Sequence, residues 1–316
     1  MKIAYHTYGT LNAAKDNVIV VVHALTANSD VSDWWNGLFG EGNLFDPSRY
    51  FIICANNLGS PYGSTCADDP HPITGQRYGL DFPAVTIRDT AVAYLELLDH
   101  LGIHQIKMLM GGSCGGNIAQ EMAILKPGLF DSLVMLCCSA KETPWVIAIH
   151  ESQRMAMHVD STFHLNNSIA GKEGLRASRA MALPYYRSHV SFVERQSEES
   201  LEKTSNFKAA SYLKYQGEKF VNRFNAHCYY SLLSVLDTHN VGRGRQSVED
   251  ALDKIKAKTL VIGFDTDLLI PTVEQKFLSQ HIPSAAYAEI NTIFGHDAFL
   301  IENDKIREAI QLHIDI

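Results

Sequence analysis

Short apolar runs alternate with amphipathic segments along much of this chain, and this alternation constrains the fold more than any other feature. Five runs are rich in β-branched residues, lack polar alternation and are bounded by turn residues: 18–23, 50–55, 106–110, 132–138 and 259–264. Such runs are typical of parallel strands that are buried on both faces. Between two of them, residues 86–101 carry apolar side chains at helical spacing. The alternation therefore predicts a mostly parallel sheet with helices on both faces.

The alternation fails between about residues 143 and 245. Helical patterns follow one another there without a convincing strand, at 144–159, 174–183, 212–225 and 227–236. The strand pattern then resumes at residue 259. We therefore predict an α/β core domain formed by residues 1–142 and 244–316, with a helical cap at 143–243 inserted between two strands of its sheet.

Charge and composition exclude several classes of protein. The 316 residues are 46% apolar and carry 27 Lys plus Arg against 35 Asp plus Glu, a formal charge of −8, which argues against a nucleic-acid partner. The sequence has no signal-peptide pattern and no apolar run long enough to span a membrane. The cysteines lack CxxC spacing, which predicts reduced thiols in a cytoplasmic protein and no metal site: Cys54, Cys66, Cys114, Cys137, Cys138 and Cys228.

A G-x-S-x-G pattern is the most informative local signal. It occupies residues 111–115, directly after the strand 106–110 and directly before a predicted helix that ends at Leu125. A sharp strand-to-helix turn needs small neighbours and would place the Ser113 hydroxyl near a helix N-terminus. A glycine-rich turn without chemistry is the alternative, but the context favours Ser113 as a nucleophile. Cys114 is expected to turn its side chain away from the apex.

An acid and a histidine follow in the order that this turn requires, which is Ser, acid, His. Asp267 comes just after the strand 259–264, and His296 comes after a further strand at 287–290 and before a final helix at 298–313. A carboxylate can orient the imidazole, which in turn removes the serine proton. Asp265 is a second candidate for the acid, although it can also serve only to cap the turn.

The oxyanion donors are expected to be two backbone N–H groups. One belongs to Cys114, directly after the nucleophile, and the other to Leu25, in the loop after the first strand. Together with Ser113, Asp267 and His296, they would suit acyl transfer.

With these residues placed, the chain resembles the homoserine O-acetyltransferase family, a branch of the α/β-hydrolase fold that includes serine and homoserine O-succinyltransferases. The resemblance covers nearly the whole chain, through YHTYGTLNAAKDNVIVVVHALT, YGLDFPAVTIRDT, GGSCGGNIAQE, SRAMALPYYRS, YQGEKFVNRFNAHCYYSLLSVLDTHNVGRGR, DTDLLIP and FGHDAFL. It implies an α/β-hydrolase fold with a helical cap and a triad of Ser113, Asp267 and His296.

The resemblance also implies a ping-pong reaction. Ser113 would take an acyl group from acetyl-CoA or succinyl-CoA and pass it to the hydroxyl of homoserine or serine, with no permanently bound cofactor. Homoserine and acetyl-CoA are the leading pair, which would feed methionine synthesis. The resemblance further implies a cytoplasmic homodimer that associates through the cap.

An amino-acid site is implied in the same way. Arg179 and Tyr186 match family positions associated with the amino acid, and Asp297 matches the carboxylate suited to its ammonium group. A guanidinium offers forked donors to a carboxylate, which agrees with that assignment. For Asp297, capping of the following helix is an alternative role.

The chain departs from the family pattern in three ways. Its loop LGSPYGSTCADDP resembles the serine O-acyltransferase branch, Cys114 stands where Met is more usual, and the stretch that usually precedes YHTYGTLN is missing, which implies the loss of one outer strand. The acceptor and the donor therefore stay open between homoserine and serine, and between acetyl-CoA and succinyl-CoA. A hydrolase of the same fold and a binding module on an inactive scaffold are the remaining alternatives.

Overall fold

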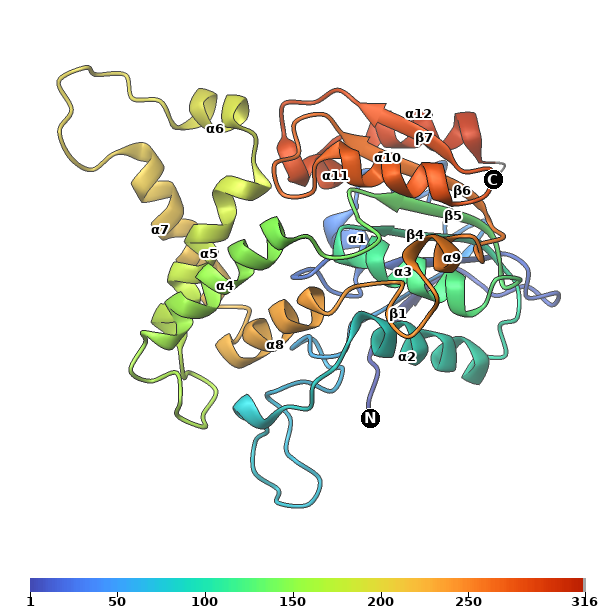
Figure 1. Cartoon of the computed structure of the whole chain (residues 1–316), viewed down its shortest axis with the longest axis horizontal. Coiled ribbons are helices and arrows are strands. Elements are labelled where there is room, and N and C mark those ends of the chain that lie inside the picture. The colour runs from blue at the N-terminus through green and yellow to red at the C-terminus, as the bar shows by residue number, and fades with distance from the viewer. Residues whose placement is uncertain (315–316) are drawn as a thin grey trace.

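A twisted, mostly parallel sheet forms the centre of the protein. The computed structural model describes residues 1–314, which contain seven strands in the order β1-β3-β2-β4-β5-β6-β7 (Figure 1). The strands are β1 (Tyr5–Tyr8), β2 (Val18–Val22), β3 (Phe51–Ala55), β4 (Ile106–Gly112), β5 (Phe130–Leu136), β6 (Lys258–Phe264) and β7 (Ala286–Ile290). All neighbours pair in parallel except β1, which is antiparallel to β3. The expected α/β-hydrolase sheet is thus confirmed.

Edge strand β1 is an element that the sequence patterns did not predict. Three of its four residues are exposed, so it lacks the buried apolar run that identifies the inner strands. Its backbone pairs Tyr5 with Ala55 and Tyr8 with Ile52. Backbone pairing and side-chain hydrogen bonds of His6 to Ser29 and of Tyr8 to Asp30 hold this edge strand, and apolar periodicity cannot reveal it.

Alternate residues of the inner strands face two separate hydrophobic clusters. Val20 and Val22 of β2 pack in one cluster, whereas Ile19 and Val21 pack in the other. The first cluster includes residues of α2 (Ile87–His100), α3 (Cys114–Leu125), α9 (Val248–Leu252) and α10 (Thr272–His281). The second includes residues of α1 (Val31–Trp34), α11 (Ala298–Ile301) and α12 (Asn303–His313). The expectation of helices on both faces is therefore confirmed.

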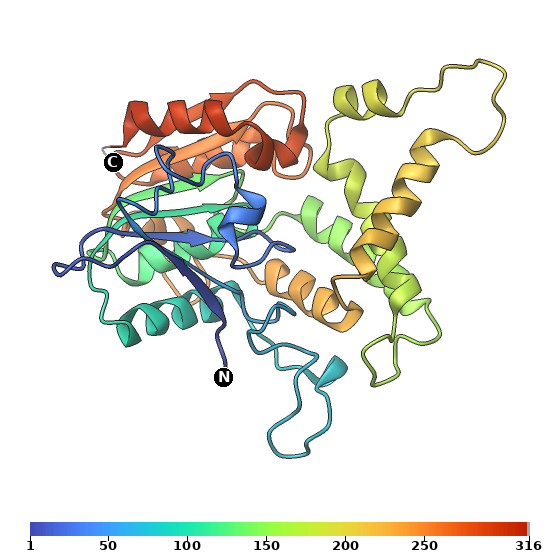
Figure 2. The ribbon, with the colours of Figure 1, turned by 180° about the vertical axis from the view of Figure 1, so that it is seen from behind.

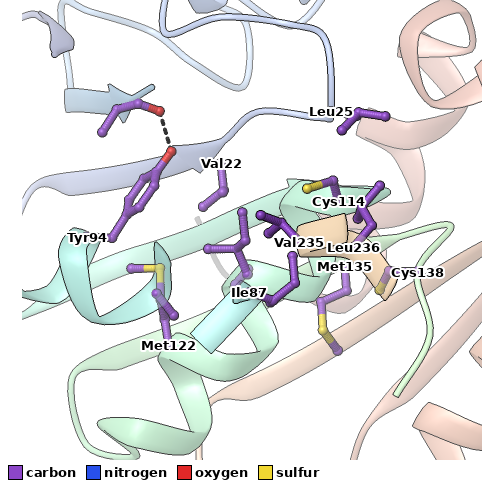
Figure 3. Close-up of a cluster of buried hydrophobic side chains, with 14 of the residues drawn as sticks. Val22, Leu25, Ile87, Tyr94, Cys114, Met122, Met135, Cys138, Val235 and Leu236 are labelled. Atoms are coloured by element: carbon purple, nitrogen blue, oxygen red, sulfur yellow. Dashed lines mark hydrogen bonds between the residues drawn. The ribbon is translucent and has the colours of Figure 1, made fainter. Parts of the chain in front are cut away.

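Helix α2 shows how local sequence and packing agree. Thr86 caps its N-terminus in a reciprocal capping box with Asp89. Figure 3 shows Ile87 and Tyr94 of this helix in the first cluster, where the Tyr94 hydroxyl donates to the carbonyl oxygen of Ala55. The helix thus attaches to β3 by a hydrogen bond as well as by its apolar face.

Helices gather beyond one end of the sheet in the segment predicted to be a cap (Figures 1 and 2). They are α4 (Pro144–His158), α5 (Lys172–Tyr186), α6 (His189–Gln196), α7 (Lys208–Val221) and α8 (Ala226–Asp237). Four follow the predicted helical patterns, whereas α6 was not predicted, and α7 begins and ends four residues before its predicted bounds. The division into core (1–142, 244–316) and cap (143–243) stays a prediction.

The predicted final helix at 298–313 is wrong in one respect, because the structure divides it. Glu302 separates α11 from α12 and has a ψ of 46°, outside the helical range. Apolar spacing continues across the break, since Phe299 and Ile306 pack in the same cluster. The sequence pattern therefore could not show the interruption.

Two further features match the sequence analysis. Within residues 1–314, no helix combines the length and apolar character needed to cross a bilayer. All six cysteines are free and buried. The remaining short elements are the 3₁₀ turns η1 (Gly79–Asp81) and η2 (Gly295–Asp297).

Candidate active site

Ser113 lies at the apex of the turn between β4 and α3. Its backbone has φ 54° and ψ −126°, a conformation that residues with a side chain rarely adopt. The Ser113 N–H donates to the carbonyl oxygen of Leu136 at 2.9 Å, which ties the strained residue to β5. Strain of this kind is held in place by its surroundings and is typical of functional sites.

Glycines beside Ser113 allow the turn to form. A Cβ on Gly115 would lie 2.1 Å from the carbonyl oxygen of Val22, and one on Gly111 would lie 2.3 Å from the carbonyl oxygen of Gly115. Neither backbone atom can move without disturbing the sheet or the helix. The prediction that the flanking positions leave no room for a side chain is confirmed.

Ser113, His296 and Asp267 meet at the carboxyl ends of β4, β7 and β6. The Ser113 hydroxyl lies 2.9 Å from Nε2 of His296, and Nδ1 of the same ring lies 2.7 Å from Oδ2 of Asp267. The carboxylate thus faces Nδ1, so Nδ1 carries the proton and Nε2 is free to accept one from the serine. The structure brings together the three side chains that the sequence pattern selected.

Asp267 is held more firmly than a surface carboxylate. Its Oδ1 accepts the backbone N–H groups of Leu269 at 2.8 Å and Ile270 at 2.9 Å, and its side chain is fully buried. Asp265 instead accepts the N–H of Thr292 at 2.9 Å and holds the loop after β7. The geometry thus favours Asp267 as the partner of His296 and gives Asp265 the structural role.

Both residues expected to supply oxyanion donors line the cavity that contains Ser113. Cys114 is the first residue of α3, so its N–H has no acceptor within the helix. Leu25 lines the same cavity. The loop of Leu25 is supported by His23, whose Nε2 accepts the N–H of Asn57 at 3.0 Å and whose Nδ1 donates to the carbonyl oxygen of Ala24 at 2.7 Å. The start of α3 thus leaves the N–H of Cys114 available for a developing oxyanion, and the N–H of Leu25 as the second donor stays a prediction.

Cys114 is suited to contribute its backbone N–H to the site, and not its thiol. Figure 3 shows its side chain in the hydrophobic cluster with Val235 and Leu236. Burial raises the pKa of the thiol to about 12, so a reactive thiolate does not form near neutral pH. The expectation that the Cys114 side chain points away from the apex is confirmed.

One cavity of about 510 Å³ contains Ser113 and His296 and is bounded by segments that follow the strands of the sheet and by cap helices. Its wall includes Arg179 and Tyr186 of α5. The Arg179 guanidinium lies 5.3 Å from the Tyr186 ring centroid and 5.0 Å from that of Phe220. Within residues 1–314, no carboxylate forms an ion pair with Arg179, whose side chain lines the cavity. An anionic group of a ligand would find this cation available.

Asp297 also lines the cavity, but the structure gives it a partner that the sequence analysis missed. Its carboxylate forms an ion pair with Arg187, the residue after the end of α5. The side chain makes no capping hydrogen bond to the following helix, so the alternative role as a cap finds no support. Arg187 belongs to the motif SRAMALPYYRS, and that proximity in sequence to Tyr186 was the only signal for it.

Glu142 and His150 are two further residues of the cavity wall that sequence reasoning did not select. Burial raises the pKa of the Glu142 carboxyl to about 8, and the carboxylates of Asp237 and Glu274 act in the same direction. Nδ1 of His150 lies 2.6 Å from Oδ1 of Asp237. No local motif marks these residues, because the polar character of the wall arises only when α4 and α8 pack together.

Cys137, Asp267 and His296 are a group whose metal-binding atoms lie within 4.8 Å of one another. The imidazole and the carboxylate already bond to each other, and burial raises the pKa of the Cys137 thiol well above its ordinary value. Zinc needs a deprotonated thiolate. The group therefore fits a proton relay better than a metal centre.

Comparisons with known proteins agree with this geometry. A family model described as the alpha/beta hydrolase fold matches residues 17–302. A homoserine O-acetyltransferase of Cyclobacterium marinum is 45% identical over 310 residues, which cover 98% of this chain and 88% of the relative. A homoserine O-acetyltransferase of Chlorobaculum parvum is 41% identical to this chain, and the match covers 86% of that relative's length.

Solved structures share the fold. A homoserine O-acetyltransferase from Staphylococcus aureus superposes with a TM-score of 0.79 at 29% identity, covering 98% of this chain and 87% of that one. Esterase E22 superposes with a TM-score of 0.87 over 98% of this chain and 93% of that one, at 24% identity, which speaks for the fold alone. The chain belongs to the homoserine O-acetyltransferase family of the alpha/beta hydrolase fold.

Proposed function

We propose that the protein transfers an acetyl group from acetyl-CoA to the hydroxyl of homoserine through an acyl-enzyme on Ser113. The observation that carries this proposal is the chain of contacts from Ser113 through His296 to Asp267, at 2.9 and 2.7 Å, in a cavity that also holds the unpaired cation of Arg179. The names of the related proteins support homoserine and acetyl as the substrate groups.

In the first half-reaction, Nε2 of His296 takes the proton of the Ser113 hydroxyl while the oxygen attacks the thioester carbonyl. The N–H groups of Leu25 and Cys114 stabilise the resulting oxyanion. When the carbon–sulfur bond breaks, the imidazolium returns its proton to the leaving thiolate. The products are the acetyl ester of Ser113 and free coenzyme A.

In the second half-reaction, Arg179 binds the carboxylate of homoserine, and Asp297 attracts its ammonium group. Tyr186 belongs to the same wall, with its ring 6.2 Å from that of His296. His296 then removes the proton of the substrate hydroxyl, which attacks the ester carbon. Collapse of the second oxyanion releases O-acetylhomoserine and restores the Ser113 hydroxyl with the proton from His296.

Purified protein tests this function directly. Incubation with acetyl-CoA should release free thiol at a rate that depends on homoserine, and Ser113→Ala should abolish the release. Serine and succinyl-CoA belong in the same assay, because they are the alternative acceptor and donor. Folded protein without homoserine-dependent thiol release would defeat the proposal, and release that no amino acid accelerates would favour a hydrolase.

The cap also carries a surface that supports a homodimer. Large apolar side chains are exposed along its helices and loops: Met155, Val159, Leu165, Ile169, Val190, Val193, Phe207 and Tyr215. Exposed apolar side chains that gather in one patch are typical of an interface. We therefore place a homodimer contact on the cap of a cytoplasmic enzyme of methionine synthesis. Sedimentation of dilute protein as a monomer would contradict the dimer.

A further inference from the structure

The acyl donor is larger than the cavity that holds the nucleophile. A cavity of about 510 Å³ is of the size that encloses a drug-sized ligand. Coenzyme A carries a diphosphate, a ribose phosphate and an adenine beyond its pantetheine arm. If the thioester lies at Ser113, these anionic groups must lie at or outside the opening, where the surrounding charges decide how they bind.

Two cations of the cap stand at this opening. Lys219 lies near the end of α7, and Arg223 follows four positions later; both line the cavity and both are exposed. Within residues 1–314, neither forms an ion pair with a carboxylate. The Arg223 guanidinium instead donates to the carbonyl oxygen of Thr26 at 2.6 Å and to the Tyr62 hydroxyl at 2.7 Å, which fixes its position across the opening.

Phe220 separates these cations from the one assigned to the amino acid. The guanidinium of Arg223 lies 5.1 Å from its ring centroid, and that of Arg179 lies 5.0 Å from it. The Phe220 ring attracts both cations, which partly offsets their mutual repulsion. The wall thus presents an inner guanidinium for one carboxylate and an outer pair of cations for a second anionic ligand.

Acidic side chains do not neutralise the outer pair. Asp33 of α1 also lines the cavity and is exposed, but within residues 1–314 it forms no ion pair with either cation. Glu218, the neighbour of Lys219, lies 2.5 Å from Arg176 in an ion pair directed elsewhere. Because the whole chain carries a charge of −8, two cations without ion-pair partners beside the nucleophile cavity are a local reversal of its general charge.

From this placement we propose that Lys219 and Arg223 bind phosphate groups of the acyl-CoA donor. The inference rests on the proposed function and adds the part of the cap that recognises the nucleotide end of the donor. Guanidinium and ammonium groups are the side chains that bind phosphate most readily. Binding there would also connect α7 to the loop of Thr26, next to the oxyanion donor Leu25.

A donor that lacks the nucleotide separates recognition of the charged nucleotide end from recognition of the thioester and its arm. S-acetylpantetheine carries the same thioester and arm without the phosphates found in acetyl-CoA. In the Lys219→Ala variant we expect KM for acetyl-CoA to rise roughly 1.5- to fivefold, the range for one exposed ion pair, with kcat unchanged. KM for S-acetylpantetheine should stay at the unmodified value. Lys214→Ala, an exposed lysine of α7 outside the cavity, is the matched control.

Arg223 needs separate variants because its guanidinium also bonds to Thr26 and Tyr62 at the opening. Arg223→Lys keeps the charge but loses the forked donors, so we expect a smaller rise in KM for acetyl-CoA than Arg223→Ala gives. Added salt should raise KM for acetyl-CoA in the unmodified enzyme and do so less in the double alanine variant.

The outcomes distinguish this inference from the function on which it rests. Equal losses with both donors in Lys219→Ala, or no change with either, would overturn the phosphate site while leaving the acyltransfer intact. Failure of the unmodified enzyme with both donors would instead overturn the proposed function.

Discussion

Arg187 forms an ion pair with Asp297, the residue that directly follows His296. The pair joins the end of α5 to the loop that carries the histidine. Two further contacts join the same segments: the Ser188 hydroxyl donates to the carbonyl oxygen of Ile293, and a Cβ on Gly295 would lie 2.6 Å from the backbone of Arg187. The position of α5 and the position of His296 are therefore linked.

This ion pair leads to a prediction about acceptor binding. Asp297→Asn should raise KM for homoserine, because it leaves the Arg187 cation unpaired beside the ammonium of the amino acid. The double variant Asp297→Asn with Arg187→Gln should recover part of the loss, since it also removes the repelling cation. Steady-state kinetics of the unmodified protein, the two single variants and the double variant measure the coupling between the two residues. Losses that simply add would show that Arg187 and Asp297 act independently and would contradict this coupling.

His296→Ala should lower turnover by roughly three to six orders of magnitude, because loss of a triad member leaves only oxyanion and binding effects. Asp267→Asn should cost about four orders, since the imidazole then loses its orienting carboxylate. Both half-reactions should slow, and thermal stability should change little. His104→Ala, an exposed histidine, is the control. Near-normal thiol release from His296→Ala would remove it from the mechanism.

Arg179→Ala should separate the two half-reactions. The first release of thiol from acetyl-CoA should persist, since Arg179 is assigned to the amino acid and not to the thioester, while the homoserine-dependent step should slow. Rapid mixing resolves the burst from the steady state. A burst that falls in proportion to the steady-state rate would contradict the assigned role.

Gly115→Ala should destabilise the fold by about 1–3 kcal/mol or more, the usual cost of an overpacked site, because its Cβ would lie 2.1 Å from the carbonyl oxygen of Val22. Gly128→Ala is the matched control, since no heavy atom lies within 4 Å of a Cβ there. Chemical unfolding of both variants measures the difference. Equal stability of the two would show that the turn can relax.

Glu142 makes stability depend on pH with a defined sign. Burial raises its pKa from 4.5 to about 8, so between these values the unfolded chain loses a proton that the folded protein keeps. The contribution of Glu142 to the free energy of unfolding should therefore fall as pH rises through this window, and Glu142→Gln should remove that contribution. Burial lowers the pKa of His23 to about 4, so between this value and 6.5 the free energy of unfolding gains a contribution that rises with pH. This contribution is the same in both proteins and cancels when their curves are compared. Parallel curves for the two proteins would contradict the prediction.

The sequence could predict the inner strands and the three converging side chains because both depend on local patterns. Ser113 follows a buried strand and precedes a helix, and Asp267 and His296 each follow a further strand, so parallel topology brings them to one edge. Edge strand β1 has no apolar run, and α6 leaves only one of its eight residues buried, so periodicity missed both. Arg187, Glu142 and Lys219 depend on how cap helices pack over the sheet, which no local pattern encodes.

Direct detection of the acyl-enzyme tests the central claim. Protein mixed with acetyl-CoA and quenched before homoserine is added should carry one acetyl group on the peptide that contains Ser113, and later addition of homoserine should remove it. Ser113→Ala should stay unmodified. An acetyl group that forms on Cys114, or turnover that proceeds in Ser113→Ala without any covalent intermediate, would contradict the account.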